Sequence, residues 1–524
     1  MYIGEVGEAV RAASSCEGPV GVPPLVEDHL CRQDVLLAPA ASAVPDRGSL
    51  AGEFVQQLAD SASHQVTIRP AVARGCAAQR TPRGLARRSS VCRRAVASTL
   101  IRARRRLPAV GAAWQPSGMD AHRRPLFDGA RRTDGSPGKH RESTFEFLNR
   151  VAGDYWEHPR DLMQQWLDHV SSGDEYMDLR NRLRSRDDDQ FRSAFLELYL
   201  HESLLRAGYE VTIHPDVAGT SSRPDFSAER DGERIYVEAI APGATPTAKA
   251  AAQRRAVLFD VVDQVPDLRF YLWLNDLSDG PRPPAAARLR ADLTRWLSTL
   301  DPTSEIDLDR AATYEWTHDG WSATFKAIPA GPGPQRRGAD HRAIGVYGHT
   351  RAGIVDDAPW IRKALTSKHR KYGDLDAPFV VAIGTYNFDS DRWHATNALY
   401  GGEAYRLSET EASEIRAQPF RHPDGYFGAP PRWQNRHVAG VLVVNQLMPY
   451  HVQRAEVTLW RHPAPFRGLP RDLGIPAATV QIEGRQLDQQ PPTGTAQDFF
   501  GLSDPWPPGE PWSGRTRYGL MRRG

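Results

Sequence analysis

Cysteine is absent from most of this 524-residue sequence. All four cysteines lie in the first hundred residues, at Cys16, Cys31, Cys76 and Cys92. A disulfide framework and cysteine-ligated zinc are therefore excluded for the rest of the chain, which fits a reducing compartment. No apolar run approaches the roughly 20 residues that a membrane helix needs, and the N-terminus lacks the basic-then-apolar order of a signal peptide. We expect a cytoplasmic protein with no membrane partner.

Lysine is also missing from the first 138 residues, although arginine is abundant there. Twelve arginines and no acidic residue lie between Arg69 and Arg106. Such a segment, poor in aromatics, cannot bury enough apolar surface to offset its chain entropy. We expect residues 1–118 to be a disordered leader, whose arginines would hold nucleic acid through its phosphates. The alternative is that Met119 is the true start, and that codon bias in a GC-rich reading frame produced the arginines.

The remaining sequence has the alternating pattern of an α/β protein. Apolar residues recur at helical spacing within 142–186 and again over 188–207, 247–265, 284–300 and 358–372. Short apolar runs bounded by turn residues predict strands at 209–213, 269–274, 378–383, 438–444 and 455–460. We divide the chain into a leader, a linker, a helical region, an α/β domain and a loose C-terminal tail, at 1–118, 119–141, 142–186, 187–484 and 485–524.

A β-hairpin between residues 223 and 240 carries the functional prediction. Asp231-Gly232 is a strong two-residue turn signal, because both turn positions favour positive φ. With this turn, Phe226 lies opposite Val237. Asp225 then lies opposite Glu238, and the two side chains point to the same face of the sheet with Cβ atoms about 4.5–5.5 Å apart.

Two opposed carboxylates repel each other unless a proton or a cation lies between them. A divalent metal is a natural partner, since Mg²⁺ takes one or two carboxylates and completes its shell with water and phosphate. A metal held in this way can lower the pKa of a bound water and stabilise charge on a phosphodiester. Asp225 and Glu238 are therefore the candidate ligands for Mg²⁺ or Mn²⁺.

The order Pro224-Asp225, hairpin, Glu238-Ala239-Ile240 resembles the PD-(D/E)XK nucleases, over about fifty residues. The resemblance implies a restriction-endonuclease-like mixed sheet flanked by helices. It also implies a supporting glutamate on the preceding helix, a position that Glu197 fits. One departure is Ile240, where the motif has a lysine that orients the attacking water.

In some members of that superfamily the motif lysine has moved to another element. The candidates here are Lys368 and Lys371, which are spaced by three on a predicted helix and would share one face. The alternative for both is a solvated basic end of the helix, which is favourable near a C-terminus.

The resulting prediction is a metal-dependent phosphodiesterase that acts on nucleic acid, with DNA favoured. Residues 119–524 carry slightly more acidic than basic residues, which argues against a broad nucleic-acid footprint. The alternative, supported by Ile240, is a catalytically inactive nuclease-like module that binds nucleic acid or a protein. A third possibility is a structural or interaction protein in which the acid pair is incidental. Convergence of Asp225, Glu238 and a lysine nitrogen would favour the enzyme.

Overall fold

The computed structural model describes residues 123–511, except 172, 268, 304–309, 331–342, 348–355, 369–370, 388, 390–391, 410–414 and 484–485. The predicted disordered leader, and Met119 with it, lie outside the described residues. Among the helices of the described part, none is both long enough and apolar enough to cross a membrane.

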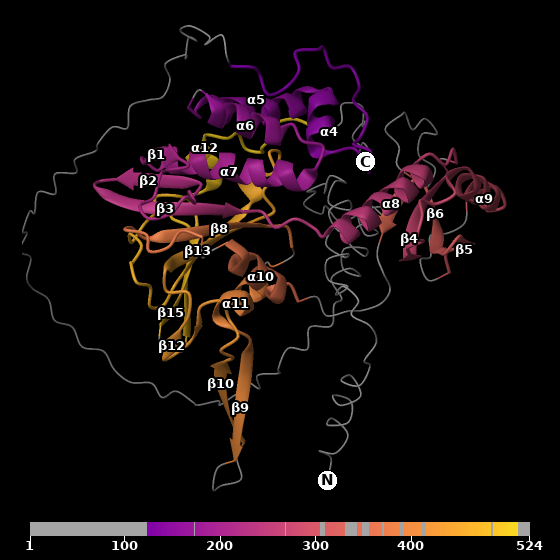
Figure 1. The fold of residues 1–524 in the computed structure, drawn as a ribbon. Coiled ribbons are helices and arrows are strands. Elements are labelled where there is room, and N and C mark those ends of the chain that lie inside the picture. The colour runs from indigo at the N-terminus through magenta and orange to yellow at the C-terminus, as the bar shows by residue number, and fades with distance from the viewer. Residues whose placement is uncertain are drawn as a thin grey trace, which may run out of the picture. The chain divides into compact units, whose positions relative to one another are not determined.

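Within the described residues, eight strands form one mixed sheet in the order β1-β2-β3-β8-β13-β14-β15-β16 (Figure 1). The pairs β3–β8, β8–β13 and β14–β15 are parallel, and the other neighbours are antiparallel. Every residue of β8 and β13 is buried, which is typical of strands covered on both faces. The bounds are β1 (Glu210–Ile213), β2 (Phe226–Arg230), β3 (Glu233–Ile240), β8 (Phe379–Thr385), β13 (Val438–Asn445), β14 (Glu456–Arg461), β15 (Ala478–Glu483) and β16 (Gln486–Gln490).

Helices cover both faces of this sheet (Figure 1). Ile235, Val237 and Ala239 of β3 face one hydrophobic core, which contains the apolar residues of α4, α5, α6 and α7. Tyr236 and Ile240 face a second core, which contains residues of α10 and α11. The bounds are α4 (Thr144–Arg150), α5 (Asp154–Asp168), α6 (Asp174–Leu183), α7 (Asp188–Arg206), α10 (Ala358–Lys368) and α11 (Trp393–Tyr400).

Local signals set the two ends of α7. The side chain of Asp187 accepts a hydrogen bond from the Asp189 backbone amide at 3.0 Å and so caps the first turn. Gly208 follows the helix with φ +85°, a conformation that glycine adopts without strain. The helix thereby ends where the chain must turn into β1, the first strand of the large sheet.

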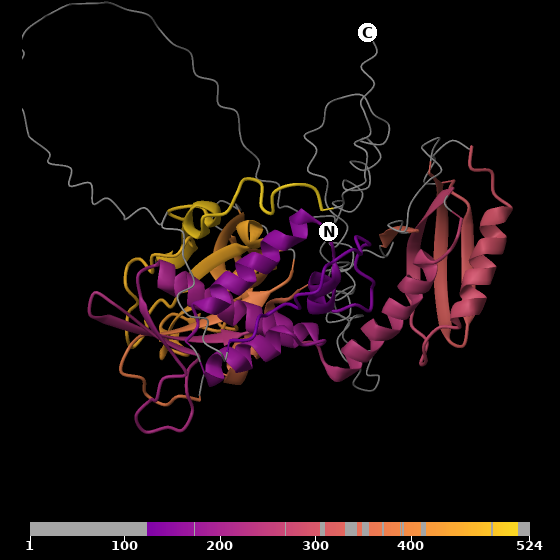
Figure 2. The same ribbon diagram turned by 90° about the horizontal axis from the view of Figure 1, so that it is seen from above.

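A second sheet of four strands, in the order β5-β6-β4-β7, carries α8 and α9 on one face (Figure 2). Asp319 and Gly320 form the turn of a second hairpin, with φ +48° and +82°, and His318 pairs with Trp321. The bounds are α8 (Pro246–Asp263), β4 (Phe270–Ser278), α9 (Ala286–Ser298), β5 (Thr313–His318), β6 (Trp321–Pro329) and β7 (Ile344–Tyr347). This assembly lies in sequence between β3 and β8 of the large sheet.

Smaller elements complete the described chain. Two hairpins pair β9 with β10 and β11 with β12, and a 3-10 helix precedes β14. Their bounds are β9 (Glu403–Glu409), β10 (Ile415–Arg421), β11 (Gly428–Ala429), β12 (Arg432–Trp433) and η1 (Val452–Arg454). None of these elements was expected from the apolar pattern, because each is short or rich in polar residues.

Two segments differ from the sequence prediction. In the expected linker, Leu126 is fully buried and Phe127 is 8% exposed, so the linker packs against the helical layer. In the expected loose tail, β16 pairs with β15, and a short helix, α12 (Ala496–Phe500), follows. The Phe500 ring lies 5.0 Å from the Trp166 ring, centroid to centroid. Aromatic burial fixes both segments despite their polar composition.

Candidate functional site on the β2–β3 hairpin

The hairpin has the register that the sequence predicts. Asp231 and Gly232 form the turn with φ +55° and +79°, and Phe226 lies opposite Val237. Across the strands, Arg234 and Glu229 form an ion pair at 3.1 Å. Since the turn fixes the register, the position of Asp225 beside Glu238 follows from local sequence alone.

Asp225 directly precedes β2 and is partly buried. One of its carboxylate oxygens accepts a hydrogen bond from the Ala239 backbone amide at 2.6 Å. Its backbone carbonyl accepts from the His214 amide at 3.0 Å. Asp225 thus continues the hydrogen bonding of the sheet before the start of β2. Its backbone carbonyl bonds the residue after β1, and its side chain takes the place of a main-chain acceptor for β3.

Glu238 lies on the face of β3 that α10 covers, and only 3% of it is exposed. Its carboxylate accepts a hydrogen bond of 2.5 Å from the hydroxyl of Tyr372, which is 4% exposed. Burial raises the pKa of Tyr372, and the hydrogen bond to Glu238 and the charges of Glu238 and Asp225 raise it further. The two carboxylates therefore both act on Tyr372, a residue that the sequence analysis does not single out.

Ile240 occupies the position of the motif lysine and is 4% exposed. It belongs to the core that also contains Ile383, its partner in the β3–β8 register, and Leu365 of α10. The surroundings of this position are therefore apolar. An ammonium group there would lose its hydration among apolar neighbours, and the acid nearest along β3 on the same face, Glu238, is already bound by Tyr372.

Glu197, the predicted supporting glutamate, is held by an arginine of a neighbouring helix. Arg182 of α6 binds both of its carboxylate oxygens, at 2.7 and 2.6 Å. The neighbouring Leu196, not Glu197, faces the sheet, since a Cβ atom at Gly384 would lie 3.3 Å from its side chain. Helical geometry turns the next residue by about 100°, so Glu197 faces α6 and joins two helices.

The two candidate lysines do not share one helix face as predicted. The helix α10 ends at Lys368, and Lys371 follows it in a bend with an exposed side chain. The side chain of Lys368 lies outside the described residues. It is Tyr372, next in sequence to Lys371, that turns inward and reaches Glu238.

Within the described residues, this hairpin offers a divalent cation no more than the two carboxylates of Asp225 and Glu238. Within the described part of the chain, no group of three or more histidine or acidic residues gathers as a metal site. Of the groups expected to assist, Glu197 is held by Arg182, and Ile240 provides no donor. Each carboxylate instead accepts a hydrogen bond from within the fold: Asp225 from the Ala239 backbone amide, and Glu238 from the Tyr372 hydroxyl.

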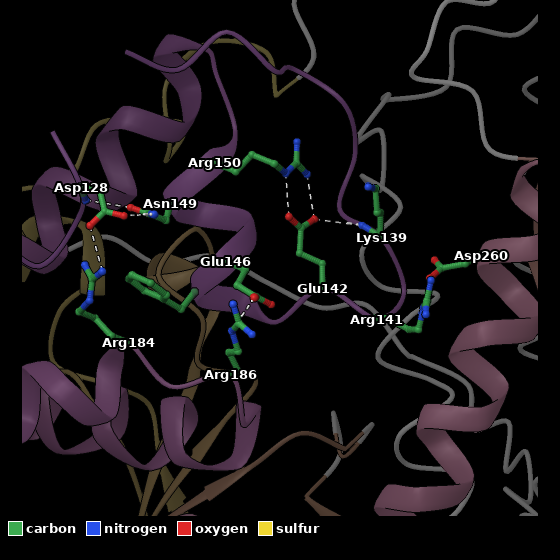
Figure 3. A pocket seen from close by; sticks show the side chains of 11 residues that line it. Asp128, Lys139, Arg141, Glu142, Glu146, Asn149, Arg150, Arg184, Arg186 and Asp260 are labelled. Carbon is green, nitrogen blue, oxygen red and sulfur yellow. Dashed lines mark hydrogen bonds and ion pairs between the residues drawn. The ribbon is translucent and has the colours of Figure 1, made fainter. Parts of the chain in front are cut away.

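A second polar site was missed by the sequence analysis. A pocket of about 530 Å³ lies beside α4 and the end of α6 (Figure 3). Five basic and four acidic side chains line it, together with Phe145 and Asn149: Lys139, Arg141, Arg150, Arg184 and Arg186, and Asp128, Glu142, Glu146 and Asp260. The available signal was the Arg180–Arg186 run, in which every second residue is arginine.

No family model, no curated protein and no solved structure matches this chain. The function has to be inferred from the chemistry of these two sites.

Proposed function

We propose that this protein is a divergent, catalytically inactive nuclease-like module that binds nucleic acid, with DNA as the favoured ligand. The large mixed sheet with helices on both faces agrees with the fold that the PD-(D/E)XK resemblance implies. Helix α7 and strand β1 precede the hairpin, which carries Glu238 on β3 and Asp225 just before β2. This supports common ancestry with restriction-endonuclease-like proteins and leaves the activity to be decided by the site.

The hydrogen bond between Tyr372 and Glu238 carries the proposal of inactivity. A carboxylate that is 3% exposed and bound by a tyrosine hydroxyl is committed to the fold, and water and phosphate reach it poorly. Ile240 also supports inactivity, since hydrolysis would lack the motif lysine that orients the attacking water. In this proposal the acid pair is retained for the packing of β3 against α10.

Nucleic-acid binding is supported by the second site. The pocket brings five arginine and lysine side chains together in the layer formed by α4, α6 and the preceding segment. Lysine and arginine recognise phosphate groups through charge-assisted hydrogen bonds. The contact is local, which is consistent with the slightly acidic balance of residues 119–524.

The test combines cleavage and binding. The full chain, purified free of metal, is incubated with supercoiled plasmid and Mg²⁺, Mn²⁺ or chelator, beside Asp225→Ala and Glu238→Ala. We expect no nicking in any condition, and retarded migration of DNA that does not depend on metal. Metal-dependent nicking by the wild type that both variants lose would contradict inactivity. Absence of any DNA or RNA complex at low salt would contradict the binding role.

The second candidate is the metal-dependent phosphodiesterase, with Asp225 and Glu238 as ligands of Mg²⁺ or Mn²⁺. It is favoured by one observation: both carboxylates act on the same tyrosine hydroxyl, so they lie near each other. A bound metal would stabilise the folded chain, by about 2.7 kcal/mol at one hundred times its Kd. A thermal shift with Mn²⁺ that disappears in Glu238→Ala would favour this candidate.

A further inference from the structure

We infer that the pocket beside α4 is a site for a phosphate monoester, either the terminal phosphate of a nucleic-acid strand or a free nucleotide. The pocket itself does not depend on the proposed function, but the choice of a nucleic-acid strand rests on it. The residues come from three places that are distant in sequence: α4 with the segment before it, the residues that follow α6, and α8. Figure 3 shows Arg184 and Arg186 on one side of the space, and Lys139 and Arg141 on the other.

Each of the four carboxylates in the pocket is already paired with an arginine. Four ion pairs join them, with these nitrogen-to-oxygen distances: Arg150–Glu142 at 2.7 Å, Arg186–Glu146 at 2.9 Å, Arg184–Asp128 at 2.9 Å and Arg141–Asp260 at 2.8 Å. These pairs neutralise one another. The acidic residues therefore do not provide a cation site, and they fix the arginine side chains in place.

Lys139 is the fifth cation, and no acid of the pocket is left for it. Its backbone amide bonds to Glu142 at 3.1 Å, but its ammonium group forms no ion pair with the described residues. The pocket thus carries one positive charge in excess. An anionic ligand would supply the missing partner, whereas a cationic or neutral ligand would not.

Further donors lie at the rim. Arg141 and Arg186 each use Nε for their ion pairs, and a guanidinium has five N–H donors. Their terminal nitrogens make no hydrogen bond with the described residues. The two side chains are 59% exposed in Arg141 and 85% exposed in Arg186. A phosphate monoester presents several strong acceptors and nearly two negative charges at neutral pH. Three cationic groups around one opening match this ligand better than a carboxylate or a diester.

The size of the pocket agrees with this assignment. A volume of about 530 Å³ is larger than a single phosphate requires and lies within the ordinary range for small-ligand pockets. The remaining space is lined by Asn149 and by Phe145, whose ring is covered by the Arg184 guanidinium at 4.7 Å. The ring of Phe127 also stacks on Phe145, 5.7 Å away centroid to centroid, and Phe145 is 6% exposed, so a sugar or base attached to the phosphate would meet a mainly polar wall. We expect recognition of the phosphate without base specificity.

The experiment measures fluorescence anisotropy of a 3′-labelled oligonucleotide that carries either a 5′-phosphate or a 5′-hydroxyl, with the full chain at low salt. We expect the phosphorylated strand to bind about tenfold more tightly, as one charge-assisted contact predicts. Lys139→Glu should remove this preference, and Lys139→Arg should retain it. Lys363→Glu is the matched control, because it makes the same charge change on an exposed residue of α10 that does not line the pocket.

A deoxynucleoside monophosphate serves as the competitor and separates the two sources of phosphate. If it binds, if Lys139→Glu weakens it, and if no oligonucleotide binds, the pocket is supported and the proposed function is overturned. If oligonucleotides bind with no preference for the phosphorylated end and the monophosphate does not compete, the pocket assignment is overturned and the proposed function stands. Loss of preference in Lys363→Glu to the same extent would also overturn the assignment, because the effect would then be one of net charge.

Discussion

The hairpin acid pair and the charged pocket are both built from ionisable side chains, but they differ in what those side chains have left to offer. At the hairpin, Glu238 is buried and bound to Tyr372, and Asp225 accepts a main-chain amide. At the pocket, the ammonium group of Lys139 and the terminal nitrogens of Arg141 and Arg186 take no part in the ion pairs. The residues that carry the family resemblance are thus engaged within the fold, and the available binding chemistry lies elsewhere.

This difference teaches that identity and spacing of residues are insufficient to assign a site. A carboxylate acts as a ligand or a base only where its lone pairs are accessible, and burial with a good donor removes that access. Substitutions at the hairpin should therefore change the free energy of unfolding, whereas substitutions at Lys139 should change binding with little effect on folding.

The largest effect is expected for Ile240→Lys, which restores the motif lysine. The new ammonium group would enter the core that contains Leu365 and Ile383, and we expect a loss of at least about 3 kcal/mol in the free energy of unfolding. Chemical denaturation measures the loss, with Ile240→Leu as a control that should cost less than about 1.5 kcal/mol. A stable Ile240→Lys protein that gains metal-dependent nicking would show that the hairpin is an active-site scaffold, and would contradict its contrast with the pocket.

Tyr372→Phe should have the next largest effect. It removes the hydroxyl that binds Glu238 and leaves a buried carboxylate one donor short, at a cost of about 2 kcal/mol. The unfolding midpoint in urea reports this change. Glu238→Gln should cost less in the same assay, because its amide oxygen can still accept from Tyr372. Equal stability of Tyr372→Phe and the wild type would show that the carboxylate is not held by the fold.

Glu142→Gln should have a smaller effect, because the pair with Arg150 is only partly buried. The two contacts at 2.7 and 2.8 Å are bidentate, and their loss should cost about 1 kcal/mol. The same variant should bind a phosphate monoester more tightly, since it removes a negative charge from the pocket while Arg150 keeps its ion pair with Asp134 at 2.8 Å. Weaker binding would mean that the Glu142 carboxylate positions Arg150 for the ligand, and does more than neutralise the charge of Arg150.

The smallest change in stability is expected for Lys139→Ala. The side chain is exposed and forms no ion pair with the described residues, so the free energy of unfolding should change by less than about 0.5 kcal/mol. Affinity for the phosphorylated strand should nevertheless fall. A thermal unfolding curve and an anisotropy titration on one preparation give both values, and a marked drop in the melting temperature would place Lys139 in the fold.

The sequence predicts best what adjacent residues decide. Asp231-Gly232 determines the register of β2 against β3, and Asp187 and Gly208 determine the two ends of α7, because the chemistry involved spans only a few residues. The α/β class and the helical layer before α7 follow from apolar periodicity. Parallel strands such as β8 and β13 are recognisable because they are apolar throughout.

The partners of the site residues could not be predicted, because each depends on packing between distant segments. Glu197 has the sequence context of a helix glutamate, and only the position of α6 assigns it to Arg182. Tyr372 is remote in sequence from Glu238 and reaches it through the path of the chain after α10. The edge strand β16 has almost no apolar residues, so its pattern is that of a loop until β15 is beside it.

The separation of β3 from β8 has a consequence for how the chain is made. These strands are neighbours in the sheet, yet residues 241–378 are synthesised between them. At ordinary rates of translation, β8 leaves the ribosome on the order of ten seconds after β3. During that interval the edge of β3 has no partner, whereas the four-stranded assembly with α8 and α9 has its own core and can fold first. The nascent protein must therefore protect an open strand edge, and chaperone dependence of its expression would be a natural result.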